Sequence, residues 1–167
     1  GIYQSPDAFG YTARVARAAA DGYRVIVQVP AGGMGWDCSV VGLTGAGVPD
    51  AAFGNAGIVQ QLSPGSGSLR CTSLAVQPDG RILLGGAEDD TDGYVGRLLA
   101  NGAIDPSFNA GVVPGRFKSV SALAVGAAGS IFVTGNDQTG FSGALIVRLL
   151  ADGTLDTLFG RAGATSV

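Results

Sequence analysis

The sequence predicts an all-β protein made of three repeated four-stranded units. The clearest evidence is "AVQPDGRILLGG" at residues 75–86, in which an alternating apolar run and a continuous apolar run flank Pro-Asp-Gly. Asp-Gly and Asn-Gly tolerate the positive φ that tight hairpin turns require. Related segments recur around residues 16–27 and 123–133, and such repetition at a fixed period is typical of repeat architectures. These observations together predict stacked β-sheets.

The strands follow from the turns. In the middle repeat we expect strands at 58–62, 72–77, 81–86 and 94–99. The run 24–27 after its leading Arg24, and the runs 82–84 and 144–147, are apolar at consecutive positions, which indicates strands covered on both faces. Residues 12–20 are rich in Ala and Arg and favour a helix by propensity. They stand where the other repeats have a strand, so we expect a strand there too.

A second repeated block ends each unit. It places an Asp three residues before a Phe, in Asp50 to Phe53, Asp105 to Phe108 and Asp156 to Phe159. We therefore predict a single repeat domain over 1–167, with repeats at about 9–53, 54–108 and 109–160 and a closing strand at 161–167.

These segments carry a family resemblance. "VQPDGRILLGG", "GRLLANGAIDPSF" and "VRLLADGTLDTLFG" resemble the bacterial delta-60 repeat, a unit associated with β-propeller folds in exported and surface proteins. Two places depart from the pattern: Ala128-Gly129 replaces Asp-Gly, and Gly42-Leu43 stands where later repeats have Arg97-Leu98 and Arg148-Leu149. The resemblance implies a propeller that is secreted, periplasmic or on the bacterial cell surface, and it carries no defined activity.

Ring closure is the open question, because propellers close with about 4 to 8 blades. The first repeat is shorter than the others before its hairpin, and the tail 162–167 resembles the segment it lacks. If the tail of one molecule repairs the head of another, two chains form a six-bladed homodimeric ring, which we expect. Repair within one chain gives a β-trefoil-like barrel instead. A third alternative is a piece of a longer propeller.

The composition disfavours two classes of partner, nucleic acids and membranes. The chain has 10 Lys and Arg against 13 Asp and Glu, so a nucleic-acid partner is disfavoured. It has no apolar run of about 18 residues, which disfavours membrane insertion. The chain has a single Lys and a single Glu, so its surface is built mainly from Gly, Ser, Thr, Asn and Asp, a composition that suits secreted β proteins.

Cys38 and Cys71 either form one disulfide, in an oxidising compartment, or remain two buried thiols.

The same composition limits the chemistry. The sequence has no His, which excludes Ser-His-Asp and Cys-His nucleophiles and imidazole metal sites, and two Cys cannot build a structural zinc site. We therefore expect no catalytic residue and no cofactor. The repeated Asp and Phe are interpreted as structural, with Arg97 and Arg148 pairing with the Asp carboxylates.

Variable loops between the second and third strands, at 30–37, 87–94 and 135–141, supply the candidate binding residues. Each loop combines an aromatic with an acid, the pattern of a glycan site. The candidates are Trp36, Asp37, Asp92, Tyr94, Asn136, Asp137 and Phe141. The spacing of Glu88, Asp90 and Asp92 also imitates the opening of a calcium loop, although its twelfth position lacks an acid.

Three functions follow from these observations. We expect a non-enzymatic extracellular or surface module for interaction or assembly, acting as a homodimer on a protein or glycan ligand. The alternative is a carbohydrate-binding lectin that uses the loop aromatics. A hydrolase that uses paired carboxylates is the third.

Overall fold

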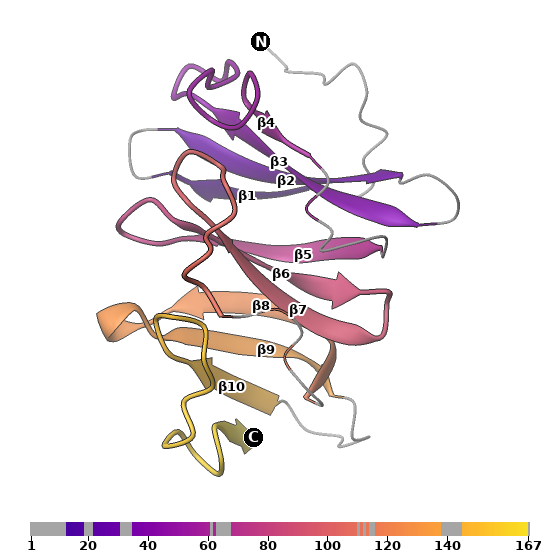
Figure 1. The fold of residues 1–167 in the computed structure, drawn as a ribbon, viewed down its shortest axis with the longest axis vertical. Helices are drawn as coiled ribbons and strands as arrows, with labels where there is room; N and C mark the ends of the chain where they lie inside the picture. The colour runs from indigo at the N-terminus through magenta and orange to yellow at the C-terminus, as the bar shows by residue number, and fades with distance from the viewer. Residues whose placement is uncertain are drawn as a thin grey trace.

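In the computed structural model, the chain forms three antiparallel sheets stacked along its longest axis (Figure 1). The structure describes residues 13–18, 22–30, 35–60, 62, 68–109, 111, 113, 116–137 and 145–166. One end of the stack is formed by the strands of the first repeat and the other end by those of the third. The second repeat lies between them and has a neighbouring sheet on each face.

The first sheet has the order β1-β2-β3-β4. Its strands are β1 (Ala13–Arg17), β2 (Tyr23–Pro30), β3 (Trp36–Leu43) and β4 (Ile58–Val59). The strand expected over 12–20 is confirmed as β1, although its residues favour a helix. Its pairing with β2, in which Val15 lies opposite Val25, supplies the hydrogen bonds that override local propensity.

The second sheet has the order β5-β6-β7, with β5 (Leu69–Val76), β6 (Ile82–Glu88) and β7 (Asp92–Leu98). A fourth segment extends it, because the Val95 amide donates to the Gly111 carbonyl at 2.8 Å and the Val113 amide to the Gly93 carbonyl at 2.7 Å.

The third sheet has the order β11-β10-β9-β8. Its strands are β8 (Phe117–Val125), β9 (Ile131–Asp137), β10 (Leu145–Leu149) and β11 (Ala164–Ser166), and the 3₁₀ turn η1 (Ala127–Gly129) joins β8 to β9. Figure 1 places the 77–81 and 126–130 turns on one side of the stack and the 88–92 hairpin on the other.

The tail does not serve as a spare strand for the first repeat. Strand β11 pairs with β10 of its own chain, in the place that β4 occupies beside β3. Each sheet takes its outer strand from the segment after the repeated Phe. The sheets therefore cover 13–59, 69–113 and 117–166, one strand out of phase with the repeats read from the sequence. The described chain forms three separate sheets, and neither a β-trefoil-like barrel nor a closed ring.

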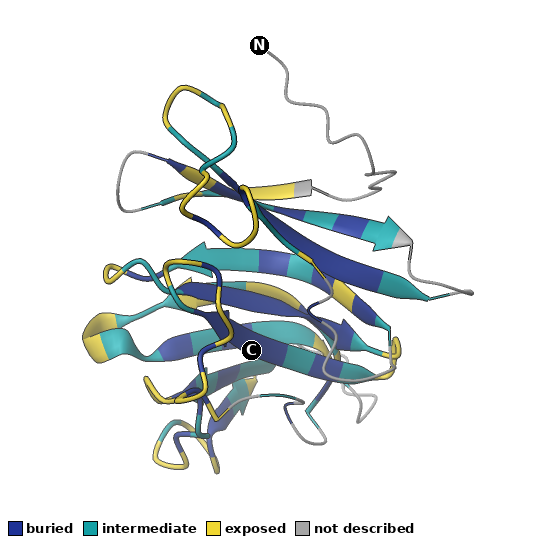
Figure 2. Cartoon of the chain, turned by 45° about the horizontal axis from the view of Figure 1, so that its top comes forward, coloured by how far each residue is buried: buried dark blue, intermediate teal, exposed yellow. Residues whose placement is uncertain are grey.

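Two apolar cores lie between the sheets. One joins Ile26 and Val40 of the first sheet to Leu84 of the second, and the other joins Leu83 and Val95 of the second sheet to residues of the third such as Val133 and Val147. Consecutive residues of β6 thus enter different cores, which confirms a strand covered on both faces. Figure 2 shows buried residues concentrated in the central strands, with more exposed positions toward the outer turns.

A disulfide crosses the first core. Cys38 of β3 and Cys71 of β5 are fully buried and bonded, with their Cα atoms 5.6 Å apart. Of the two alternatives left by the sequence, the structure has the bonded one. The bond joins the first sheet to the second through two cysteines that are 33 positions apart in the sequence.

Candidate functional site

Each sheet repeats one contact among an arginine, an aspartate and a phenylalanine, which we call the clasp. In the second sheet, Arg97 Nε donates to Asp105 Oδ2 at 2.7 Å, and its guanidinium carbon lies 4.4 Å from the centre of the Phe108 ring. The clasps of the other sheets consist of Arg24, Asp50 and Phe53, and of Arg148, Asp156 and Phe159. An arginine that is ion-paired and stacked at once holds the outer turn against its sheet.

The aspartate of the clasp also closes its own turn. Asp105 Oδ1 accepts hydrogen bonds from the Ser107 amide at 2.9 Å and from the Ser107 hydroxyl at 2.6 Å. These bonds, together with the Arg97 guanidinium, hold the pKa of Asp105 below its usual value although the residue is buried. The pairing of Arg97 and Arg148 with the repeated aspartates, expected from the sequence, is confirmed.

The clasp of the first sheet uses an arginine from a different strand. Arg24 lies on β2 directly opposite Gly42 of β3, whereas Arg97 lies on β7 and Arg148 on β10, the strands equivalent to β3 in their sheets. A Cβ on Gly42 would lie 2.7 Å from the Phe53 ring, so the ring fills the space of the missing side chain. The alignment of the repeats identified Gly42 as a departure from the pattern. It did not identify Arg24 as the residue that supplies the missing arginine.

The turn after the clasp is one residue shorter in the second sheet. Four positions separate Phe53 from Gly57 and Phe159 from Gly163, but three separate Phe108 from Gly111. In the first sheet, the Gly42 amide donates to the Gly57 carbonyl at 2.8 Å. In the second, the Gly111 carbonyl instead accepts from Val95, two residues before the clasp arginine. The outer segment is thus displaced along β7, and no described residue occupies its usual place beside Arg97.

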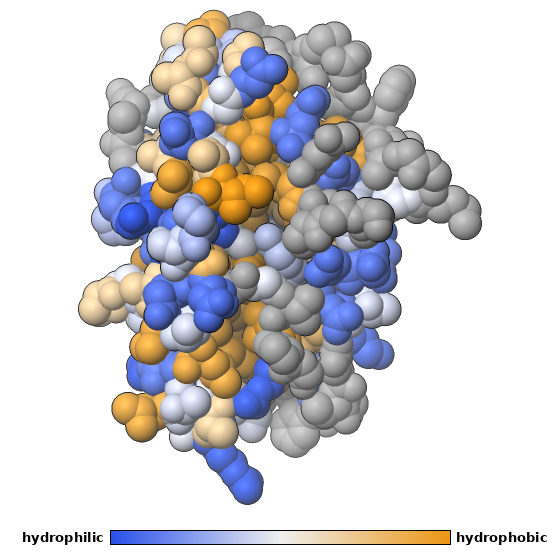
Figure 3. Space-filling view, viewed as in Figure 1, coloured by the Kyte–Doolittle hydropathy of each residue, from blue (hydrophilic) through white to orange (hydrophobic). Residues whose placement is uncertain are grey.

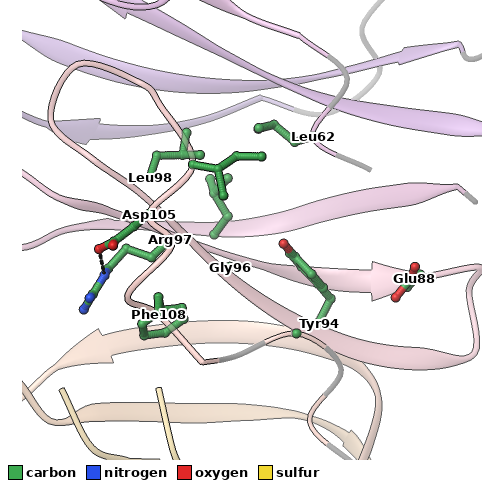
Figure 4. A pocket seen from close by; sticks show the side chains of 11 residues that line it. Leu62, Glu88, Tyr94, Gly96, Arg97, Leu98, Asp105 and Phe108 are labelled. Atoms are coloured by element: carbon green, nitrogen blue, oxygen red, sulfur yellow. Dashed lines mark hydrogen bonds and ion pairs between the residues drawn. The ribbon is translucent and has the colours of Figure 1, made fainter. Parts of the chain in front are cut away.

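This displacement creates a groove beside β7, with a volume of about 440 Å³ (Figure 4). Ile104 lines it and is 69% exposed. In the other sheets the equivalent Pro49 and Leu155 are covered, because Gly57 and Gly163 lie directly against them. No acceptor for the Arg97 amide is found in the described part of the chain. The remaining lining residues are Leu62, Leu84, Glu88, Tyr94, Gly96, Leu98, Asp105, Phe108 and Gly111.

Tyr94 is the predicted binding residue that lies in the groove. Its side chain passes over Gly96 of the same strand, which has no Cβ to obstruct it. Burial and the nearby charge of Glu88 raise the pKa of the Tyr94 phenol, so it remains a neutral hydroxyl at physiological pH. Sequence reasoning found Tyr94 but not Ile104 or Leu62. The signal for both was the shorter spacing between Phe108 and Gly111.

The other predicted glycan residues are distributed over three sheets. Trp36 begins β3 and is half-buried; its amide donates to the Ser68 hydroxyl at 2.8 Å, and that hydroxyl donates back to its carbonyl at 3.0 Å. Asp37 is buried and accepts from the Cys38 amide at 2.8 Å. Neither residue lines the groove.

In the third sheet, Asn136 is exposed and its amide group donates to the Ser119 hydroxyl at 3.2 Å, while Asp137 ends β9. Phe141 lies outside the described residues. The structure therefore brings Tyr94 to a groove and leaves Trp36, Asp37, Asn136 and Asp137 at strand ends of the neighbouring sheets.

The calcium candidates occupy a tight hairpin between β6 and β7. Glu88 lies opposite Asp92, and Asp89 and Asp90 between them both have positive φ, a conformation that Asp tolerates better than most residues. Asp90 pairs with Arg70 at 3.2 Å, and Asp92 accepts from the Thr91 hydroxyl at 3.0 Å. Within the described ranges no three acidic side chains converge on a metal-binding point. The acidic residues at 88–92 therefore build a hairpin turn that is held by an ion pair with Arg70.

Figure 3 shows apolar surface along the middle of the face that contains the groove, with hydrophilic groups beside it. In the part of the chain that the structure describes, no helix reaches the length and hydropathy required to span a membrane.

Comparison with known proteins agrees with the fold. Residues 77–108 and 129–159 each match a family model described as a domain of unknown function (DUF5122) beta-propeller. No curated protein and no solved structure matched the chain. Each matched segment runs from a hairpin turn to the Phe of a clasp, and so covers the two central strands of one sheet, β6 and β7 or β9 and β10. Together with the three stacked antiparallel sheets, the match in these two segments supports a β-propeller-type repeat fold.

Proposed function

We propose that the protein is a non-enzymatic extracellular interaction module that binds a short extended peptide in the groove beside β7. The observation that carries this proposal is the displaced outer segment of the second sheet. It leaves an apolar groove of about 440 Å³ in the place where the other two sheets have their outer turn.

An extended peptide suits the groove because strand edges are completed by backbone hydrogen bonds. In the third sheet, the Arg148 amide donates to the Gly163 carbonyl at 3.1 Å. In the second sheet, a carbonyl of the bound peptide takes the corresponding bond from Arg97. An apolar side chain of the peptide then covers Ile104, as Gly163 and its neighbours cover Leu155 in the third sheet.

Two further observations support the remaining parts of the proposal. The repeated aspartates are engaged by arginines and by backbone amides, which disfavours a role in proton transfer and hence a carboxylate hydrolase. The buried disulfide favours an oxidising location outside the cytosol, because cytosolic thiols are kept reduced.

A glycan is the second candidate ligand. It is favoured by Tyr94, whose ring and neutral hydroxyl lie in the groove near Glu88. An aromatic face and a carboxylate acceptor are the groups that bind a sugar ring. This candidate makes Tyr94 the main contact, whereas the peptide candidate depends chiefly on Ile104.

The test is binding of a fluorescent library of short peptides, in parallel with a glycan array. Ile104→Asp should weaken peptide binding by about tenfold or more, since an apolar anchor is replaced by a charge. Leu158→Asp is the matched control, because Leu158 is an apolar residue that is 90% exposed and lies outside the groove. Equal effects of the two variants on binding, or no detectable binding of any peptide in the library, would contradict the peptide proposal. Binding on the glycan array that Tyr94→Ala abolishes would favour the second candidate.

A further inference from the structure

Neighbouring sheets are linked by a repeated joint between the clasp of one sheet and an outer turn of the next. The Gly54 amide, after the first clasp, donates to the Asn101 carbonyl at 2.7 Å. The Asn109 amide, after the second clasp, donates to the Asp152 carbonyl at 2.7 Å. Arg97 Nη1 of the second clasp also donates to the Ala151 carbonyl at 2.6 Å. Each clasp therefore acts as a socket for a turn of the following sheet.

The third clasp is a socket that no sheet of the described chain fills. The Arg148 side chain is 32% exposed, against 6% for Arg97 and 11% for Arg24. Phe159 is half-buried, whereas Phe53 and Phe108 are buried. Gly160 stands in the place of Gly54, with nearly the same φ, and among the described residues no acceptor is found for its amide.

The first sheet carries the matching turn, which we call the plug, at residues 44–48. Its Thr44 amide donates to the Val48 carbonyl at 2.9 Å and its Gly47 amide to the Thr44 carbonyl at 2.9 Å. The two turns that fill the internal sockets, at 99–103 and 150–154, have the same pair of bonds. Ala46 stands in the position of Asn101 and Asp152, whose carbonyls accept the hydrogen bonds of the two internal joints.

The outward faces of the two end sheets are also exposed, whereas the equivalent faces of the second sheet are covered. Val15 on the open face of the first sheet is 67% exposed, while Leu74, its counterpart in the second sheet, packs against the first core. Ala124 on the open face of the third sheet is exposed, while its counterpart Ala75 packs against the second core. Both halves of an interface that already exists twice in the molecule are thus present on one chain, and no described residue covers either of them.

We propose that the socket of the third sheet binds the plug of a second copy of the chain. Because every copy has one socket and one plug, the contact is head-to-tail and forms a ring if the rotation closes. Two copies supply six sheets, within the range of about 4 to 8 blades at which propellers close. The joint involves neither Ile104 nor the groove, so the proposal stands independently of the proposed ligand.

Sedimentation equilibrium of the purified chain, over about 1 to 100 µM, tests the proposal in the range where a micromolar Kd is measurable. The expected result is a mass that rises to twice that of the 16.6 kDa chain and no further. Ala124→Arg places a charge on the open face of the third sheet and should give a monomer. Leu158→Arg adds the same charge beside the socket and should still dimerise, because the equivalent Ala52 and Ser107 remain exposed in the filled joints.

A second variant protects the test against misfolding of the first. Val15→Arg places a charge on the open face of the first sheet, where the counterpart Leu74 of the second sheet packs against the first core, and it should also give a monomer with an unchanged circular dichroism spectrum. A wild-type chain that remains monomeric at the highest concentration would overturn the proposal, and would leave a further sheet of a longer polypeptide as the occupant. Growth into polymers of unlimited mass, or loss of the dimer in Leu158→Arg, would overturn it equally.

Discussion

Reduction of the disulfide between Cys38 and Cys71 should remove a large part of the stability of the chain. The bond closes a loop of 33 residues, and the loop-entropy relation then gives about 3.7 kcal/mol at 25 °C. For a chain of 167 residues, a loss of this size lowers Tm by about 7 to 15 °C. The loss falls on the contact between the first two sheets, because Cys38 lies on β3 and Cys71 on β5.

Urea unfolding of the oxidised and reduced wild type measures this difference without creating a cavity. A Cys38→Ala, Cys71→Ala double variant is the control in which reductant should have no effect, and it should be less stable than the reduced wild type because its core loses two sulfur atoms. Since both sulfurs are fully buried, thiol reductants should also reduce the disulfide of the folded protein slowly. A difference below about 1 kcal/mol between oxidised and reduced protein would refute the loop-entropy argument.

Three other predictions concern the clasps and the groove. Phe53→Ala should cost about 3 to 5 kcal/mol in urea unfolding and Phe159→Ala distinctly less in the monomer, since only the first ring is fully buried; equal losses would contradict the open socket. Because the pKa of Asp105 is lowered by folding, its contribution should be present above its unfolded pKa of about 4 and decline as pH falls through the folded value; Asp105→Asn should flatten that acid limb of the stability curve. Insertion of one alanine after Asn109 should restore the outer turn and protect the Arg97 amide from hydrogen exchange, and unchanged exchange would contradict the origin assigned to the groove.

Much of the architecture was predictable because turn chemistry and repetition are local signals. The hairpin at Asp79-Gly80, the strand at β1 and the pairing of Arg97 with Asp105 each follow from short sequence patterns. The phase of the sheets did not follow, because an outer strand is fixed by pairing with a strand that precedes it by about fifteen residues or more. The sequence of 56–60 is compatible with either neighbouring sheet, and only its pairing with β3 decides between them.

The groove escaped prediction for a different reason. A single missing residue between Phe108 and Gly111 changes no motif, and its effect appears only after the two flanking sheets provide a reference. The acids at Asp89 and Asp90 were conspicuous in the sequence but satisfy a turn with positive φ and a pair with Arg70. Residues chosen for their chemistry were therefore less informative about the site than a change in spacing.

The first clasp shows that the contact of arginine, aspartate and phenylalanine recurs in each sheet even where its arginine comes from a different strand. Residues opposite each other on one face of a sheet have Cβ atoms about 5 Å apart, so Arg24 reaches the aspartate and ring that an arginine at position 42 would reach from the adjacent strand. The exchange works only with Gly42, because the Phe53 ring occupies the space of a side chain there. The contact is thus preserved while its sequence position is not. The same reasoning applies at the ends of the stack, where the plug at 44–48 has the backbone bonds of the two internal turns but none of their Asn-Gly or Asp-Gly sequence.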